Sequence, residues 1–99
     1  MHCLTVTYPP PKDAAHFKAY YEGTHLPLAK QFPGLKSCTF AYPEALGPAP
    51  APFCIFQAWF DDGAAMLAAL QSEIGQRVVA DVPNFASAGA TVFHFPVGG

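Results

Sequence analysis

Apolar and polar residues alternate along four short segments of the chain, and this period-two pattern predicts four β-strands. The predicted strands cover residues 2–8, 35–42, 53–60 and 90–96, and each is rich in residues that favour strands. Prolines follow the first strand directly and end it, because proline has no N–H to donate to a sheet. The third strand is apolar on both faces except for Gln57, which indicates an interior strand that is covered on both sides.

The first helix is predicted between the first two strands, where apolar side chains recur at helical spacing. Asp13 can cap its start by accepting hydrogen bonds from the first free N–H groups. We expect an interruption near Gly23 and Pro27, since glycine weakens a helix and proline cannot supply the N–H of its own turn. A second short helical piece is then predicted over residues 27–32.

The second helix is predicted to follow Asp61 or Asp62, either of which can cap it. Gly75 is the position at which we expect this helix to bend. Residues 43–52, between the second and third strands, hold four of the eleven prolines and are predicted to form a projecting loop. The apolar stripe of the second helix is formed by Leu67, Leu70, Ile74 and Val78.

The resulting order, β-α-β-β-α-β, predicts an α+β domain of the ferredoxin-like type with a four-stranded antiparallel sheet. Residues 1–99 are expected to form a single domain, because a chain of this length holds one core. In this fold the helices cover one sheet face and leave the other bare. Since both faces of the strands are largely apolar, we expect the bare face to be buried against a second copy of the chain.

The composition also favours a homodimer. Apolar residues make up 52% of the chain and charged residues only 12%, whereas an ordinary soluble domain carries about 25% charged residues. The chain has no run of about 20 apolar residues that could span a membrane, and no basic segment followed by an apolar signal core opens it. We therefore expect a cytoplasmic protein whose surplus apolar surface is covered by its partner subunit.

Several classes of ligand are disfavoured by the sequence. The net charge is −2 without a cluster of Lys or Arg, so no nucleic acid is expected, and no glycine-rich fingerprint for a phosphate occurs. Because Glu22 and His25 form a single E-x-x-H pair and no H-x-x-x-H spacing occurs, we expect no metal ion. We also expect no cofactor. The cysteines are odd in number and widely spaced, and we interpret them as reduced core residues: Cys3, Cys38 and Cys54.

Each predicted strand has one apolar face and one face with polar groups. The polar groups are Thr5, Thr7, Ser37, Thr39, Gln57 beside Trp59, and His94 beside Val92. Such a face could line a pocket with a few hydrogen-bonding groups. Alternatively, these are tolerated polar residues of a dimer core that bond to the backbone or to water. The alternation alone leaves open which face the helices cover.

The segment 20–28 places an imidazole, His25, at the expected helix interruption between aromatic residues and a Leu-Pro-Leu step. A histidine in apolar surroundings stays largely neutral, because desolvation disfavours the imidazolium, and a neutral imidazole can accept a proton. His25 is therefore a candidate general base. The alternative is a structural histidine whose ring bonds a backbone carbonyl where the helix breaks.

The residues around His25 resemble the signature of a known family. The motif reads Phe17-x-x-Tyr20-Tyr21-x-x-Thr24-His25-x-Pro27-Leu28, followed by Pro33-Gly34-Leu35, and it is similar to that of the EthD family. The family is similar to other dimeric α/β-barrel proteins, among them muconolactone isomerases and cofactor-independent antibiotic-biosynthesis monooxygenases. The resemblance implies a homodimer whose two sheets close into a barrel, with the His25 position in a pocket between helices and sheet. It also implies a link to breakdown of ethyl tert-butyl ether or to aromatic or polyketide metabolism.

Two main functional hypotheses follow. In the first, the protein is a small cofactor-independent enzyme, isomerase or oxygenase-like, in which His25 is the general base for an apolar, oxygen-bearing small molecule. Its substrate-binding residues would be Tyr20 or Tyr21, which orient the oxygen, with Phe40, Phe56, Gln57, Trp59 and His94. In the second, the protein is an accessory binding protein that sequesters a hydrophobic metabolite or haem-like ligand without catalysis. A third hypothesis is a module whose only task is assembly.

Overall fold

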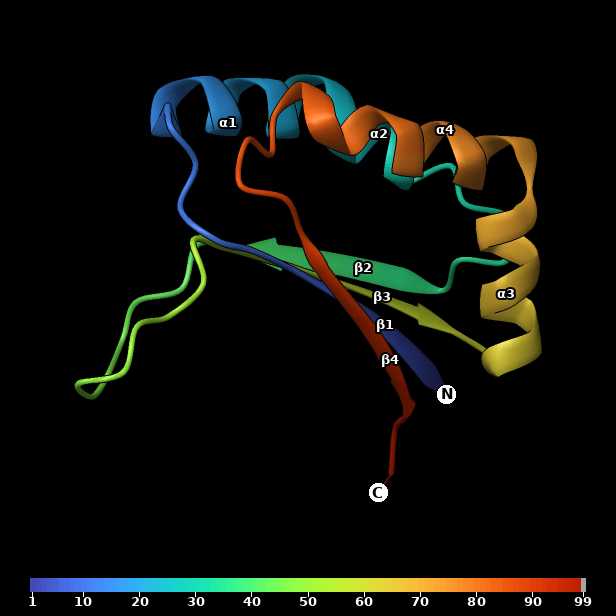
Figure 1. Cartoon of the computed structure of the whole chain (residues 1–99). Coiled ribbons are helices and arrows are strands. Elements are labelled where there is room, and N and C mark those ends of the chain that lie inside the picture. Colours follow the sequence, from blue (N-terminus) through green and yellow to red (C-terminus); the bar gives the residue numbers. More distant parts are fainter. Residues whose placement is uncertain (99) are drawn as a thin grey trace.

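The four predicted strands form one antiparallel sheet with the strand order β2-β3-β1-β4 (Figure 1). The computed structural model describes residues 1–98. Its strands are β1 (His2–Tyr8), β2 (Ser37–Ala41), β3 (Cys54–Phe60) and β4 (Thr91–Pro96). This order, with a helical segment in each β-α-β crossover, confirms the predicted ferredoxin-like α+β fold. The expected interior position of β3 is also confirmed, since β3 lies between β2 and β1.

The first crossover is helical and is interrupted as predicted. Asp13 caps α1 (Ala14–Tyr20) by accepting a hydrogen bond from the backbone N–H of His16. The chain then widens into one π-helical segment, η1 (Tyr21–His25), and returns to α-helix in α2 (Leu26–Ala29). A π-helical turn inserts an extra residue into the hydrogen-bond ladder and often marks a functional position in a helix.

The second crossover differs from the prediction, because the expected single helix is broken at Ser72. Its two parts are α3 (Gly63–Gln71), which Asp62 caps, and α4 (Glu73–Asp81). Ser72 has an extended backbone, with φ −66° and ψ 165°, and its hydroxyl accepts the N–H of Gly75 as the cap of α4. The predicted apolar stripe is therefore not continuous: Leu67 is 51% exposed, and Met66 and Ala69 are buried in its place.

Gly75 has a packing role rather than the bending role expected from the sequence. A Cβ atom at this position would overlap the carbonyl oxygens of Ala69 and Leu70. Only glycine can occupy this corner, where the first turn of α4 rests on the last turn of α3. After α4 the chain makes a short 3₁₀ turn, η2 (Val82–Asn84), and then leads to β4.

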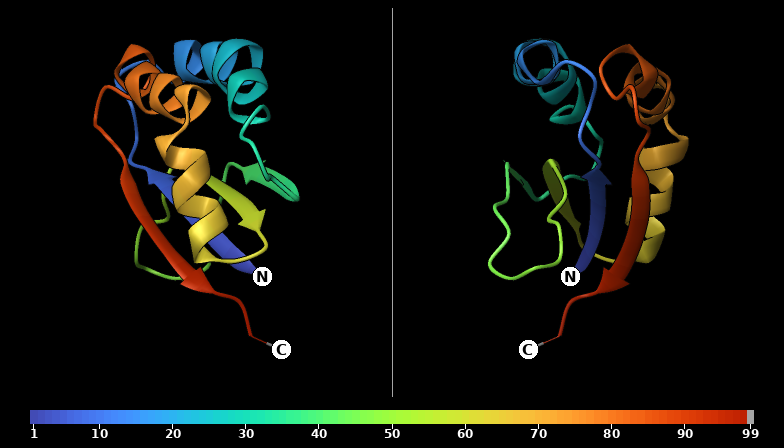
Figure 2. Two further views of the ribbon diagram at one scale, coloured as in Figure 1. Left: turned by 90° about the vertical axis from the view of Figure 1, so that its right-hand side faces the viewer. Right: turned by 60° about the vertical axis from the view of Figure 1, so that its left-hand side comes forward.

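The helices form one layer over a single face of the sheet, and the opposite face is left bare (Figure 2). On the covered face, Leu4, Tyr8 and Phe56 belong to the buried core together with side chains of the helical layer. The loop of residues 43–52 projects away from the body of the molecule, as predicted (Figure 1). None of the helices in residues 1–98 is long and apolar enough to cross a membrane.

Candidate functional site

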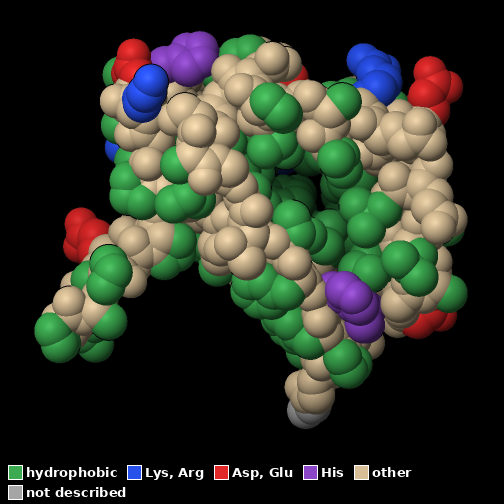
Figure 3. Space-filling model, viewed as in Figure 1, with side chains coloured by type: hydrophobic (Ala, Val, Ile, Leu, Met, Phe, Trp, Pro, Cys, Tyr) green, Lys and Arg blue, Asp and Glu red, His purple; other side chains and the backbone are tan. Residues whose placement is uncertain are grey.

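A cavity of about 300 Å³ lies between the covered face of the sheet and the helical layer. Figure 3 shows it as a deep hollow that is ringed by hydrophobic side chains. Two polar side chains line it, those of Tyr8 and His25, and all its other lining residues are aliphatic, aromatic or proline. The cavity is therefore suited to an apolar molecule that makes a few directed polar contacts.

His25 reaches this cavity from the end of η1 and is only 4% exposed. Its ring is stacked on Tyr21, with centroids 5.6 Å apart, and lies 4.5 Å from the ring of Phe85 on another side. Its Nδ1 atom lies 2.8 Å from Oδ2 of Asp81. Because a carboxylate can only accept, Nδ1 carries the proton, and Nε2 is left with a free lone pair.

Nε2 of His25 remains accessible. Nε2 makes no hydrogen bond to the described residues. Within residues 1–98, the only side-chain nitrogen or oxygen that lacks both a hydrogen-bond partner and solvent-accessible surface is the hydroxyl of Tyr21. Nε2 therefore keeps some accessible surface, and the cavity is the space that this buried side chain lines. A ligand in the cavity can reach an unprotonated ring nitrogen.

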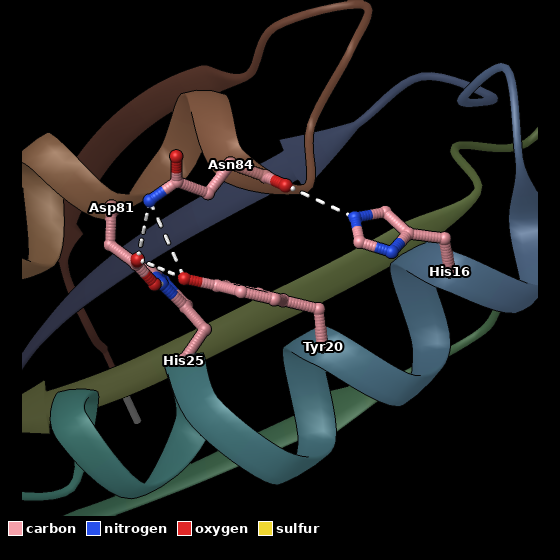
Figure 4. A network of polar contacts seen from close by, with 5 residues as sticks. All are labelled: His16, Tyr20, His25, Asp81 and Asn84. Atoms are coloured by element: carbon pink, nitrogen blue, oxygen red, sulfur yellow. Dashed lines mark hydrogen bonds and ion pairs between the residues drawn. The ribbon is translucent and has the colours of Figure 1, made fainter.

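Asp81 is the centre of a small polar network at the end of α4 (Figure 4). Its Oδ1 accepts a hydrogen bond of 2.6 Å from the Tyr20 hydroxyl and one of 3.0 Å from the side-chain amide of Asn84. His16 extends the network, since its Nε2 lies 3.2 Å from the backbone carbonyl of Asn84. With Oδ2 bonded to His25, both oxygens of the carboxylate are held in place.

Burial and hydrogen bonding keep the two central groups in opposite states. Burial lowers the pKa of His25, and the hydrogen bond and charge of Asp81 oppose this shift without cancelling it. For Asp81, burial alone would raise the pKa of the carboxyl, but the hydrogen bonds from Tyr20, Asn84 and His25 outweigh it and hold the pKa low. Near neutral pH the imidazole is therefore neutral and the carboxylate is ionised.

Of the candidate residues from the sequence, His25 and Phe56 line the cavity. Tyr20 and Tyr21 adjoin it without lining it: the first bonds to Asp81, and the second packs against the imidazole with its hydroxyl buried and unpaired. Phe40 is 38% exposed and packs against Tyr21, with ring centroids 5.8 Å apart. These five candidates come together around the π-helical segment and the sheet beneath it.

The other three candidates lie elsewhere. Gln57 and Trp59 point to the bare face of the sheet, where the amide of Gln57 donates a hydrogen bond to the hydroxyl of Thr5. His94 points to the covered face, outside the lining of the cavity, and its Nδ1 lies 2.8 Å from Nε2 of His2. The grouping of His94 with the polar face was wrong, because in the sheet register it lies beside Leu4 of the covered face.

Sequence reasoning missed Asp81, Asn84 and Tyr8. One signal for Asp81 was available: an acidic side chain in the last turn of a helix is disfavoured by the helix dipole, so it needs a compensating partner. Its partner, His25, lies 56 positions earlier in the chain, and the pairing appears only when α4 packs beside α2. No group of three or more His, Cys, Asp or Glu that could hold a metal ion occurs among the described residues.

Comparison with known proteins gives a family and a close sequence relative. A family model of the EthD domain matches residues 9–89. An uncharacterised 11.0 kDa protein from the thcB–thcC intergenic region of Rhodococcus erythropolis is 36% identical over 93 residues. The match covers 93% of this chain and 90% of that relative.

Solved structures with the same fold have lower sequence identity. An EthD family protein from Bacillus halodurans superposes with a TM-score of 0.91 at 22% identity, over 99% of both chains. A dimeric ferredoxin-like protein of unknown function from Thermobifida fusca gives 0.71 at 12% identity, over 97% of this chain and 89% of that one. SnoaB, a cofactor-independent oxygenase from Streptomyces nogalater, gives 0.66 at 14% identity, over 97% and 91%. At these identities the likeness shows the fold.

Proposed function

Since the chain belongs to the EthD family, we propose that it is a small cofactor-independent enzyme in which His25 removes a proton from an apolar, oxygen-bearing molecule. The observation that carries this proposal is the state of the imidazole. It is neutral, its Nδ1–H is held by Asp81, and its Nε2 is accessible at a cavity with otherwise apolar walls.

Asp81 has a positioning role in this reaction. The carboxylate fixes the tautomer of His25 and the orientation of its ring, and it stabilises the imidazolium that forms when Nε2 takes a proton. Tyr20 and Asn84 hold the carboxylate from the other side, so it does not turn away when the imidazole becomes charged. The substrate proton moves to Nε2, and its electron pair stays on the substrate.

The dimensions and walls of the cavity support a compact apolar substrate. An apolar cavity of about 150 Å³ accommodates benzene, so the space of about 300 Å³ in this protein has room for two fused rings. The similarity to SnoaB supports chemistry without a cofactor, because that protein is a cofactor-independent oxygenase of this fold. The carbanion formed at His25 can take the proton back from Nε2 at another carbon, as in an isomerase, or react with O₂ as the oxidant, as in an oxygenase.

A homodimer through the bare sheet face is part of the proposal. Large apolar side chains lie on this face: Ile55, Trp59, Phe93 and Phe95. Phe93 is 44% exposed and stacks with Phe95, with ring centroids 6.2 Å apart. Burial of this face against a second copy would remove it from water, and the similar protein of Thermobifida fusca is dimeric.

A cytoplasmic location is also part of the proposal. Its support is that the three cysteines are free, which is consistent with a reducing compartment.

Deuterium exchange tests the catalytic proposal without knowledge of the natural substrate. The probe is 2-tetralone, a two-ring ketone with C–H groups next to its carbonyl. The protein is incubated with this ketone in D₂O, and incorporation of deuterium is followed by mass spectrometry. We expect exchange well above the buffer rate, and we expect His25→Ala to lower it by roughly 100-fold or more. His2→Ala is the control, since His2 lies outside the cavity.

Equal exchange by the parent protein and His25→Ala would overturn the role of His25. If 2-tetralone binds in the cavity but incorporates deuterium no faster than in buffer alone, the catalytic proposal is overturned and the accessory binding function is favoured. That alternative has one observation in its favour: apart from the phenol of Tyr8, His25 is the only titratable side chain among residues 1–98 that lines the cavity.

A further inference from the structure

Tyr8 lines the same cavity as His25 and packs against two of the same aromatic rings. It is the last residue of β1, points to the covered face of the sheet, and lines the cavity. Its ring lies 5.5 Å from the ring of Phe85 and 5.7 Å from that of Tyr21, measured between centroids. His25 packs against the same two rings, at 4.5 Å and 5.6 Å. The phenol and the imidazole therefore pack against the same two aromatic rings in the wall of one cavity.

The Tyr8 hydroxyl has no partner within residues 1–98, yet it is not sealed in the core. The hydroxyl makes no hydrogen bond to the described part of the chain. Unlike the Tyr21 hydroxyl, it keeps some solvent-accessible surface. Tyr8 as a whole is only 2% exposed, so the small accessible surface of its hydroxyl faces the space that the residue lines. A buried hydroxyl without a partner is costly unless a ligand or a water satisfies it.

The hydroxyl is a donor at every pH at which the protein would work. Burial raises the pKa of Tyr8 well above its usual value, and the nearby Cys54 and Asp81 raise it further. Tyr8 therefore keeps its proton, whereas His25 lacks one on Nε2. The cavity thus holds one hydrogen-bond donor and one proton acceptor, whose rings share the neighbours Tyr21 and Phe85.

We propose that Tyr8 donates a hydrogen bond to a carbonyl oxygen of the substrate while Nε2 of His25 removes a proton from the carbon next to that carbonyl. This inference rests on the proposed function and adds to it a substrate class, the enolisable apolar ketones and their vinylogues. A neutral donor, Tyr8, and a neutral base, His25, suit a neutral ketone as the substrate. An apolar cavity binds a neutral ketone more readily than an anion.

The step balances without a further reactant. The C–H bond breaks, its proton bonds to Nε2, and its electron pair forms the C=C bond of an enolate while the carbonyl electrons move to oxygen. The negative charge develops on the oxygen that Tyr8 contacts, where a preformed donor stabilises it most. The positive charge develops on the ring of His25, which Asp81 holds.

Binding measurements with Tyr8→Phe test this inference. The two probes are 2-tetralone and tetralin, which share a skeleton and differ in the carbonyl oxygen. We expect Tyr8→Phe to weaken binding of 2-tetralone by roughly three- to tenfold and to leave tetralin unchanged. The matched control is Tyr42→Phe, because the Tyr42 hydroxyl bonds to Glu22 and does not line the cavity. Exchange of 2-tetralone in D₂O should slow in Tyr8→Phe and keep its rate in Tyr42→Phe.

The outcomes separate this inference from the proposed function. If Tyr8→Phe binds both probes like the parent and exchanges at the same rate, the role of Tyr8 is wrong, while loss of exchange in His25→Ala would still support the base. If Tyr8→Phe weakens both probes equally, the effect is one of packing and the hydrogen bond to the carbonyl is refuted. If His25→Ala retains full exchange while Tyr8→Phe loses its preference for the ketone, the role of Tyr8 as hydrogen-bond donor is supported and the role of His25 as base is refuted.

Discussion

Oδ2 of Asp81 lies 2.8 Å from Nδ1 of His25, although the two residues stand 56 positions apart and belong to different crossovers of the fold. The histidine comes from a π-helical turn and the aspartate from the last turn of α4. This pair links the wall of the apolar cavity to the polar network of Tyr20 and Asn84 at the surface.

Asp81→Asn should make His25 a weaker base. The amide removes the negative charge that raises the pKa of the imidazole, so the pKa of His25 falls further below its usual value. Each unit of lost basicity can lower the exchange rate by up to about tenfold. An NMR titration of the His25 ring protons measures the pKa, and the deuterium-exchange assay measures the rate. An unchanged ring pKa would contradict the coupling of these two residues.

Stability should fall as the solution is acidified below about pH 6.5, the usual pKa of an unfolded histidine. The folded protein lowers the pKa of His25 and so binds fewer protons there than the unfolded chain does. The stabilising contribution is complete above the unfolded pKa and is lost as the pH falls toward the folded one. Urea unfolding at several pH values should show a smaller loss in His25→Gln than in the parent protein. An identical loss in both would contradict the prediction.

Gly75→Ala should destabilise the fold and slow exchange. The new Cβ would overlap the carbonyl oxygens of Ala69 and Leu70, so α4 has to shift and carries Asp81 with it. Overpacking of this kind costs about 1–3 kcal/mol. The matched control is Gly23→Ala, whose Cβ would meet nothing within 4 Å and which should be neutral or stabilising by about 0.5–1 kcal/mol. Urea unfolding of both variants checks the difference, and equal stability of the two would refute it.

Phe93→Lys should convert the proposed dimer into a monomer. A charge at this position of the bare sheet face would have to be buried without a partner in the interface. Analytical ultracentrifugation at micromolar concentration should give a dimer for the parent protein and a monomer of about 10.6 kDa for the variant. Leu67→Lys is the control, because Leu67 is 51% exposed on α3, on the helical side. A monomeric parent protein would overturn the proposed dimer.

Local features could be predicted because they depend on near neighbours in the chain. The alternation of side chains and the prolines at strand ends located four strands within two residues of their observed bounds. Gly23 and Pro27 placed the helix interruption, and Asp13 placed the helix start. The second helix was the exception, because the Ser72 cap and the clash at Gly75 arise from contact between two helices and leave the apolar spacing intact.

The sequence by itself determined the order of elements, the single antiparallel sheet and a neutral imidazole at a helix interruption. Only the tertiary structure decided which sheet face is covered, since alternation groups residues without saying where the crossovers place the helices. That choice placed Gln57 and Trp59 on the bare face and Tyr8 in the cavity. The tertiary structure also decided the partner of His25, because the packing of α4 brings Asp81 to the imidazole. No local spacing encodes a contact between residues that lie so far apart in the sequence.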